Sequence, residues 1–149
     1  MMFGGVALLN LDSKGRLAIP AKHRDALLEG CGGRLTVTVD PSQCLLIYPQ
    51  PAWEPVRDKL NNLPAFNPQA RALQRLILGH AEEVEIDSAG RILLSTTLRS
   101  FAQLDKAVAL VGLGSKFELW DEARWHAQTA AALAMSPADI AAQLDGFVL

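Results

Sequence analysis

The sequence is poor in the residues that build disulfide frameworks and metal sites. Its 149 residues include two cysteines and three histidines. Cys31 and Cys44 do not form a Cys-x-x-Cys pair and have no histidine at metal-ligand spacing, so neither a disulfide framework nor a zinc site is expected. This usage of cysteine is typical of proteins in the reducing cytoplasm, and we expect that location.

Long hydrophobic runs and an excess of one charge are also missing. No apolar stretch approaches the roughly 20 residues that a helix needs to cross a bilayer. Residues 1–5 lack the basic region and the long apolar core of a signal peptide, so no membrane partner is expected. With 14 basic and 16 acidic residues, the net charge of −2 excludes a uniformly basic protein but allows a basic patch on one face.

Apolar residues are abundant, since half of the chain is hydrophobic. A chain of this length and composition can bury a sizeable core as one ordinary domain, or as two very small ones if the sequence repeats. A disordered tail is excluded because such tails are poor in hydrophobic residues.

The chain does contain an internal repeat. Residues 12–17 (Asp-Ser-Lys-Gly-Arg-Leu) return as residues 87–92 (Asp-Ser-Ala-Gly-Arg-Ile), and at the same offset of 75 Arg24 corresponds to Arg99. Further along, the offset shortens to 72, where residues 45–48 correspond to 117–120 and Trp53 to Trp125. An ordered series of matches predicts two copies of one supersecondary unit, each unable to close a core alone.

Each copy has the same predicted plan of strands and a short helix. In the first copy, strands at residues 6–11 and 16–19 form a hairpin around an Asp-Ser-Lys-Gly turn, because aspartate bonds nearby amides and glycine accepts a positive φ. A helix follows until Gly30. Alternation of Leu35, Val37 and Val39 with threonines predicts a strand with one solvent-facing side. The remaining predicted elements are a strand at 44–48, strands at 84–86, 91–94, 107–111 and 117–120, and helices starting near 51–53, 68, 97, 122 and 137.

Positive charge is concentrated near the start of the chain. Residues 1–24 hold four basic residues against one acid (net +3), whereas the matching residues 76–99 hold two against four (net −2). A two-stranded ribbon fits the DNA major groove, where arginine can bond guanine and lysine can neutralise phosphate. The candidate DNA-binding residues are therefore Lys14, Arg16, Lys22 and Arg24, with less weight on Arg91 and Arg99.

A purely structural interpretation of these residues is also open. Asp12 and Arg16 could form a salt bridge across the turn, with the lysines merely solvated. The second copy keeps the aspartate, glycine and arginine of the loop but lacks the additional lysines. This favours a structural role for the three residue types that both copies share. We therefore assign Asp12, Gly15, Asp87 and Gly90 to turn geometry.

No residues are arranged for catalysis. The three histidines lie on separate predicted helices or their ends, and neither repeated loop pairs its serine with a histidine. The glycine pairs lack the spacing of nucleotide-binding loops, so they are interpreted as turns. Trp53, Trp120 and Trp125 are interpreted as core or interface anchors. We expect no enzymatic activity, no cofactor and no metal.

The repeated motif also carries a resemblance. Residues 12–20 (Asp-Ser-Lys-Gly-Arg-Leu-Ala-Ile-Pro), 78–82 (Leu-Gly-His-Ala-Glu), the second Asp-x-x-Gly-Arg and 116–120 (Lys-Phe-Glu-Leu-Trp) closely resemble the MraZ family, within the AbrB/MazE-like regulators. The resemblance covers residues 2 to about 126. It implies a mainly β fold with flanking helices, in which two SpoVT-AbrB-type units pack as a split β-barrel. The implied boundaries are 7–54 for the first unit, 55–82 for linker helices, 83–126 for the second unit and 127–149 for C-terminal helices.

The resemblance implies a function as well. Such proteins assemble as ring-like homo-oligomers and bind short direct repeats of double-stranded DNA upstream of the division and cell-wall gene cluster, which predicts association with the nucleoid. The implied DNA contacts are the Asp-x-x-Gly-Arg loops. Two departures are Gly4, where a basic residue is common, and Ser95, where a proline matching Pro20 is expected. A protein-interaction or antitoxin-like scaffold with incidental DNA contact is the alternative.

Overall fold

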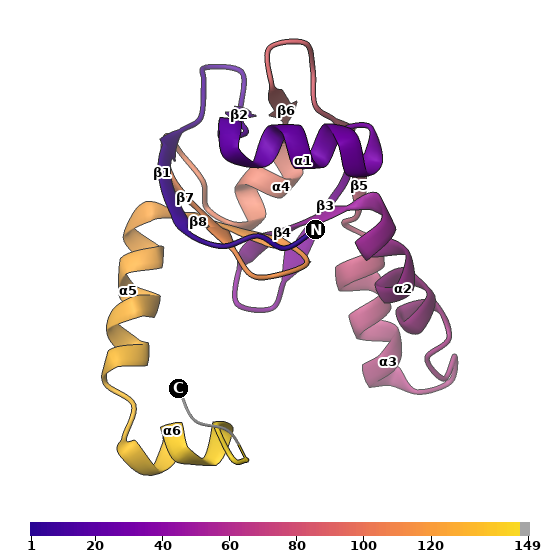
Figure 1. Cartoon of the computed structure of the whole chain (residues 1–149). Coiled ribbons are helices and arrows are strands. Elements are labelled where there is room, and N and C mark those ends of the chain that lie inside the picture. Colours follow the sequence, from indigo (N-terminus) through magenta and orange to yellow (C-terminus); the bar gives the residue numbers. More distant parts are fainter. Residues whose placement is uncertain (147–149) are drawn as a thin grey trace.

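The computed structural model describes residues 1–146 of the chain, with strands at the centre and helices around them (Figure 1). The elements of the first half are β1 (Val6–Asn10), β2 (Arg16–Ala18), α1 (Ala21–Cys31), β3 (Arg34–Asp40), β4 (Cys44–Pro49), α2 (Gln50–Asn61), α3 (Pro68–Leu73) and the π-helical turn η1 (Gln74–Leu78). Those of the second half are β5 (Glu82–Glu85), β6 (Arg91–Leu93), α4 (Thr96–Phe101), β7 (Ala107–Gly112), β8 (Phe117–Asp121), α5 (Glu122–Leu133) and α6 (Pro137–Gln143).

The strands form one six-stranded antiparallel sheet and one two-stranded ribbon. The sheet order is β1-β7-β8-β4-β3-β5, and the ribbon pairs β2 with β6. In the two repeats, β1 corresponds to β5, β3 to β7 and β4 to β8. When each strand is replaced by its counterpart, the sheet order is the same list of strands read from the opposite edge. The first strand of each repeat therefore pairs with the third strand of the other, and the two repeats are interlocked.

This pairing corrects the predicted hairpins. The loop after β1 does reverse the chain, but β1 pairs with β7 and β2 pairs with β6. Pairing across the repeats places Leu17 of β2 opposite Ile92 of β6, and both side chains are fully buried. A hairpin closed within one repeat would not bring these two apolar side chains together. The ribbon is therefore built by one strand from each repeat.

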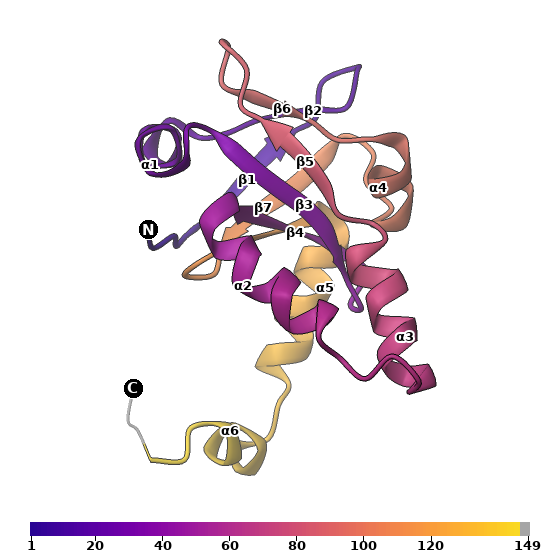
Figure 2. The same ribbon diagram turned by 90° about the vertical axis from the view of Figure 1, so that its right-hand side faces the viewer.

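The main core lies between the sheet, the ribbon and helices α1 and α4. Leu27 of α1 and Leu98 of α4 are both fully buried in it. Near the N-terminus Phe3 is buried too, with its ring 4.3 Å from that of Phe117 between centroids. The two corresponding helices thus close the core on either side of the ribbon (Figure 2).

The other face of the sheet is also covered, which corrects the prediction of a solvent-facing side for β3. Thr36 and Thr38 are buried. The Thr36 hydroxyl lies 2.6 Å from Oε1 of Gln50 on α2, and that of Thr38 lies 2.5 Å from the carbonyl oxygen of Ile77 in η1. Strict alternation of apolar and polar residues predicted the strand correctly, but the hydroxyls are satisfied by helices rather than by water.

Small aromatic clusters attach the helices to this outer face. Trp53 of α2 packs with Tyr48, and Trp125 of α5 packs with Trp120, in corresponding places of the two repeats. Trp53 and Trp120 are buried. The interpretation of the tryptophans as packing anchors is confirmed for these contacts.

Most helix ends follow the sequence signals. Asn67, Asp121 and Ser136 cap α3, α5 and α6 with their side chains, and Ser136 forms a complete capping box with Asp139. Helix α1 instead passes through Gly30 and ends at Cys31, and the residue that caps it, Gly32, has a φ of +64°. Gly33, which follows it, also has a positive φ of +74°, whereas Gly30 keeps the helical conformation.

Helices α5 and α6 extend away from the sheet (Figures 1 and 2). Only the start of α5 packs on the strands, and Leu133 near its end is 82% exposed. Among residues 1–146, no helix combines the length and apolar character needed to cross a lipid bilayer.

Candidate nucleic-acid interface

The loop between β1 and β2 is held by the side chain of Asp12. One carboxylate oxygen accepts hydrogen bonds from the backbone amides of Lys14 and Arg16, each at 2.9 Å, and the other accepts from Nε of Arg16 at 2.6 Å. The backbone closes the loop from Asp12 N–H to the Arg16 carbonyl and from Gly15 N–H to the Asp12 carbonyl, both at 3.0 Å. Gly15 permits this geometry because its φ of +81° suits glycine.

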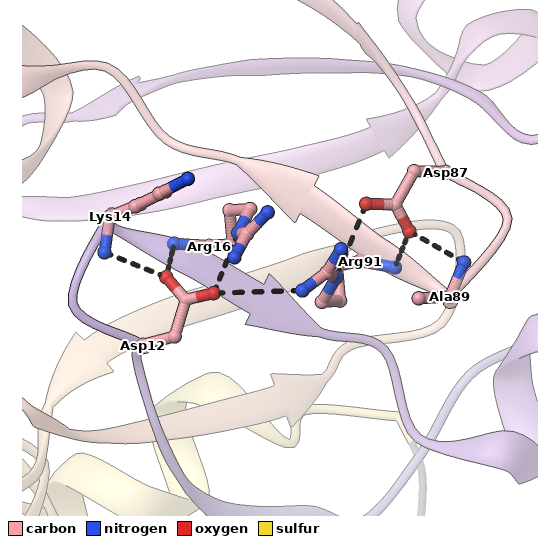
Figure 3. Close-up of polar contacts among 6 residues, drawn as sticks. All are labelled: Asp12, Lys14, Arg16, Asp87, Ala89 and Arg91. Atoms are coloured by element: carbon pink, nitrogen blue, oxygen red, sulfur yellow. Dashed lines mark hydrogen bonds and ion pairs between the residues drawn. The ribbon is translucent and has the colours of Figure 1, made fainter.

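The loop between β5 and β6 repeats this arrangement. Asp87 accepts from the amides of Ala89 and Arg91 at 2.9 Å and from Nε of Arg91 at 3.2 Å. Gly90 has a φ of +79°. The interpretation of the aspartates and glycines as turn residues is supported by these contacts, and Figure 3 shows both carboxylates making them.

Hydrogen bonding lowers the pKa of both aspartates. The amide of Arg16 is the main cause that lowers the pKa of Asp12 to about 2, and the Arg16 guanidinium adds to it. The amide of Arg91 likewise lowers the pKa of Asp87. Both carboxylates are thus ionised at neutral pH and hold the Nε side of their arginines.

The two loops are joined across the ribbon. Ile19 N–H donates to the Gly90 carbonyl at 2.9 Å, and Leu94 N–H donates to the Gly15 carbonyl at 3.1 Å. In addition, Nη1 of Arg91 lies 3.9 Å from the Asp12 carboxylate. Arg16 and Arg91 therefore lie side by side between the loops (Figure 3).

Arg24 and Arg99 make a second pair of crossed contacts. Arg24 donates to the Ile19 carbonyl at 2.9 Å and Arg99 to the Leu94 carbonyl at 3.1 Å. Each guanidinium packs against the glycine of the opposite loop, so that a Cβ on Gly90 would overlap Arg24 and one on Gly15 would overlap Arg99. Nε of Arg24 is buried and has no hydrogen-bond partner within residues 1–146. These two arginines thus brace the loops, a structural function that their sequence positions alone did not indicate.

The outward face of the ribbon carries the partly exposed arginines of the site. Leu17 and Ile92 point inward and are fully buried, whereas the alternate positions on both strands face away from the core. The side chains of Arg16 and Arg91 are 28% and 33% exposed. Two further residues on this face, Ala18 and Leu93, were not singled out from the sequence, although the alternation of the two strands contains that signal.

The predicted lysines lie apart from one another. Lys14 is exposed at the tip of the first loop. Lys22 is exposed at the start of α1, and its ammonium lies beside Gly5 rather than at the loops. The structure therefore brings together Arg16, Arg91 and Lys14, with Arg24 and Arg99 beneath them and Lys22 on the flank.

The acidic residues of the second repeat lie mostly on another surface. Glu82, Glu83 and Glu85 belong to β5, which pairs with β3. Glu82 accepts a hydrogen bond from Ser95 at 2.6 Å, and Ser95 also caps α4. A groove between α2 and β5 is lined by the side chains of Arg34, Gln50, Glu54, Arg57, Glu83 and Glu85. Of the four acidic residues within 76–99, Glu83 and Glu85 thus line this groove, whereas Asp87 stays in the loop beside the ribbon.

The salt bridge between Arg16 and Asp12, which was the structural interpretation of Arg16, is present in the structure. This ion pair uses Nε, and within residues 1–146 the two terminal nitrogens of Arg16 have no protein acceptor. A guanidinium held at Nε can still present both terminal nitrogens as a fork. In the same described part of the chain, no three metal-binding side chains are gathered at one place.

Comparison with known proteins places the chain in a family. The family model "MraZ protein, putative antitoxin-like" matches residues 2–76 and again residues 77–148. The "Transcriptional regulator MraZ" of Nitrosomonas europaea is 58% identical over 148 residues, covering 99% of this chain and all of the relative. Proteins of the same name from Thiobacillus denitrificans and Chromobacterium violaceum are 56% and 55% identical over the same coverage. With two matches to the family model that follow its internal repeat, and with full-length relatives of this similarity, the chain belongs to the MraZ family.

Proposed function

We propose that this protein is a sequence-specific, DNA-binding transcriptional regulator without enzymatic activity. The observation that carries the proposal is the pair of joined Asp-x-x-Gly-Arg loops, which hold Arg16 and Arg91 side by side on the outward face of one ribbon. The names of the relatives, each called a transcriptional regulator, support the same conclusion.

The ribbon has the shape and the donors for the major groove. A two-stranded β-ribbon fits that groove, and a guanidinium fork can donate to O6 and N7 of guanine. Because Asp12 and Asp87 hold Nε of their arginines, less conformational entropy is lost when the terminal nitrogens bind a base. Binding then depends on a pre-organised pair of arginines rather than on a large contact area.

Local charge explains how an acidic chain could bind a polyanion. Lys14 stands beside the two arginines, whereas Glu83 and Glu85 face the groove along α2. The field at the ribbon is therefore more positive than the net charge of −2 suggests. Lys14 and Lys22 would contact phosphates, and Arg24 and Arg99 would act chiefly by bracing the loops, with any direct DNA contact a secondary role.

Assembly would multiply a weak contact. We propose that several copies form a ring-like homo-oligomer whose ribbons bind short direct repeats, about one helical turn (roughly 10 base pairs) apart. The operator would lie upstream of the division and cell-wall gene cluster, and the protein would be cytoplasmic and associated with the nucleoid. The exposed arm formed by α5 and α6 supports assembly, because its apolar residues Leu133 and Ile140 are uncovered in the single chain.

The proposed domain organisation follows the repeats. Residues 7–54 and 83–126 would form the two SpoVT-AbrB-type units, with linker helices at 55–82 and a C-terminal helical segment at 127–149, of which residues 147–149 lie outside the described part of the chain. The palindromic strand order of the sheet and the shared ribbon support a split β-barrel made by both units together.

A second candidate function is a protein-interaction or antitoxin-like scaffold. The same exposed arm favours it, since a partner protein could cover α5 and α6. The family description also contains the word antitoxin. In that case the ribbon would touch DNA only incidentally.

Footprinting separates these functions. The purified protein is incubated with the DNA upstream of its own gene, and the mass of the assembly is measured in parallel. We expect protection of regularly spaced short repeats by an oligomer. Absence of protection, together with capture of a protein partner through the C-terminal helices, would favour the scaffold instead.

A further inference from the structure

The outward face of the ribbon contains an apolar position beside the arginines. In the antiparallel register Arg16 lies directly opposite Leu93, and Ala18 lies directly opposite Arg91. Directly opposite residues of an antiparallel pair project on the same side. This face therefore presents two arginines together with one large and one small apolar side chain.

Packing within residues 1–146 does not account for Leu93. Its neighbours Ile92 and Leu94 are fully buried, whereas Leu93 is 57% exposed and belongs to none of the apolar clusters. The corresponding residue of the first repeat is Ala18, which has far less apolar surface. A solvent-exposed leucine between two arginines suggests a binding partner whose surface carries an apolar group next to hydrogen-bonding groups.

The major groove of DNA offers one such group, the 5-methyl of thymine. We propose that Leu93 contacts a thymine methyl beside the base that Arg16 binds. This inference rests on the proposed function of the ribbon. Leu93 and Arg16 are neighbours across the strands, with a separation of about 5 Å that lies between one base-pair step of about 3.4 Å and two such steps, so their side chains can contact adjacent base pairs.

The same contact would make the recognised site asymmetric. The two loops are nearly equivalent in geometry, so arginines alone would read two similar half-sites. Ala18 is too short to make the contact that Leu93 makes, and only one half of the ribbon would then distinguish thymine. An asymmetric element repeated in one direction suits such a ribbon better than a palindrome does.

Single-atom changes in the DNA test the contact. The probe is the DNA fragment upstream of the protein's own gene, in which each thymine is replaced in turn by deoxyuridine, which lacks only the methyl group. For the unaltered protein we expect one position in each repeat at which the replacement weakens binding about four-fold, the value for burying one such carbon. For Leu93→Ala we expect equal affinity for thymine and deoxyuridine at that position.

Control variants test whether the effect is specific to the side chain of Leu93. Leu8→Ala removes another exposed leucine, 54% exposed on β1 and outside the ribbon, and should keep the discrimination. Ala18→Leu should add sensitivity to a second methyl. Thermal unfolding and the mass of the assembly should be unchanged in Leu93→Ala, because its side chain is exposed.

The outcomes distinguish the inference from the function on which it depends. Suppose that the unaltered protein protects the fragment and that Leu93→Ala still discriminates thymine from deoxyuridine at the same positions as the unaltered protein. This inference alone is then overturned. A changed assembly mass in Leu93→Ala would also overturn it, since Leu93 would then contact another copy. If the unaltered protein protects no part of the fragment, both the inference and the proposed function fail.

Discussion

The two Asp-x-x-Gly-Arg loops share one geometry but carry different side chains. In each, the aspartate accepts the same two amide hydrogen bonds and the glycine has a φ near +80°. The distance from the arginine Nε to the aspartate Oδ2 is 2.6 Å in the first loop and 3.2 Å in the second. Lys14 of the first loop corresponds to Ala89 of the second. The backbone conformation of the loop therefore does not depend on the charge of the tip residue, so this residue can differ between the two repeats.

The comparison also shows that the loops are not independent of each other. Each donates or accepts backbone hydrogen bonds across the ribbon, and each glycine is covered by an arginine of the other repeat. A change in one loop should therefore affect the second, whereas a change of an exposed tip residue should not.

The largest expected effect is that of Arg16→Ala on DNA binding. Loss of a pre-organised guanidinium fork in every subunit should weaken specific binding by about 100-fold or more, since one bidentate base contact contributes about 1–3 kcal/mol. Arg91→Ala should cause a smaller loss. Gel shifts with both variants measure the difference, and unchanged affinity for Arg16→Ala would remove its role as a reader. Folding and assembly should be intact in each.

The next effect is that of Gly90→Ala on stability. The positive φ and the overlap with the Arg24 side chain should together lower the free energy of unfolding by about 1–3 kcal/mol. Gly4→Ala is the matched control, because no atom lies within 4 Å of the Cβ position there. Denaturant unfolding provides the comparison, and equal midpoints for the two variants would contradict the crossed bracing.

A smaller effect is expected from pH. The pKa of Asp12 is about 2 in the folded chain and 3.8 without the loop contacts. Its contribution to stability is therefore fully present above about pH 4 and is lost as the pH falls toward 2. Asp12→Asn should remove this part of the acid dependence, while Asp25→Asn on α1 should leave it unchanged. Unfolding midpoints measured between pH 5 and pH 2 show whether the two variants differ.

The smallest expected effect is that of Lys14→Ala. An exposed lysine at the loop tip should contribute one phosphate contact, so its loss should reduce the salt dependence of binding by about one unit of slope per contact. The preference for particular bases should stay the same. Lys59→Ala, an exposed position on α2, is the control. A change in base preference for Lys14→Ala would indicate that this residue reads bases.

Local hydrogen bonding made the loops and helix caps predictable. Asp12 and Asp87 bond amides two and four residues ahead, and Asn67 and Ser136 bond amides two or three residues ahead, so a short stretch of sequence contains every partner. The strands were predictable for a similar reason, because their alternation is visible within a few residues. The duplication and the membership in the MraZ family were also readable from the sequence.

Long-range contacts were not predictable in the same way. The sequence by itself determined two copies of one loop and the concentration of cations near the first. Only the tertiary structure decided that β2 pairs with β6, that Arg24 and Arg99 cover the opposite glycines, and that Leu93 lies beside Arg16. These facts depend on segments about 75 residues apart, and their packing follows from burying Leu17 against Ile92, a choice that no local pattern of either segment expresses.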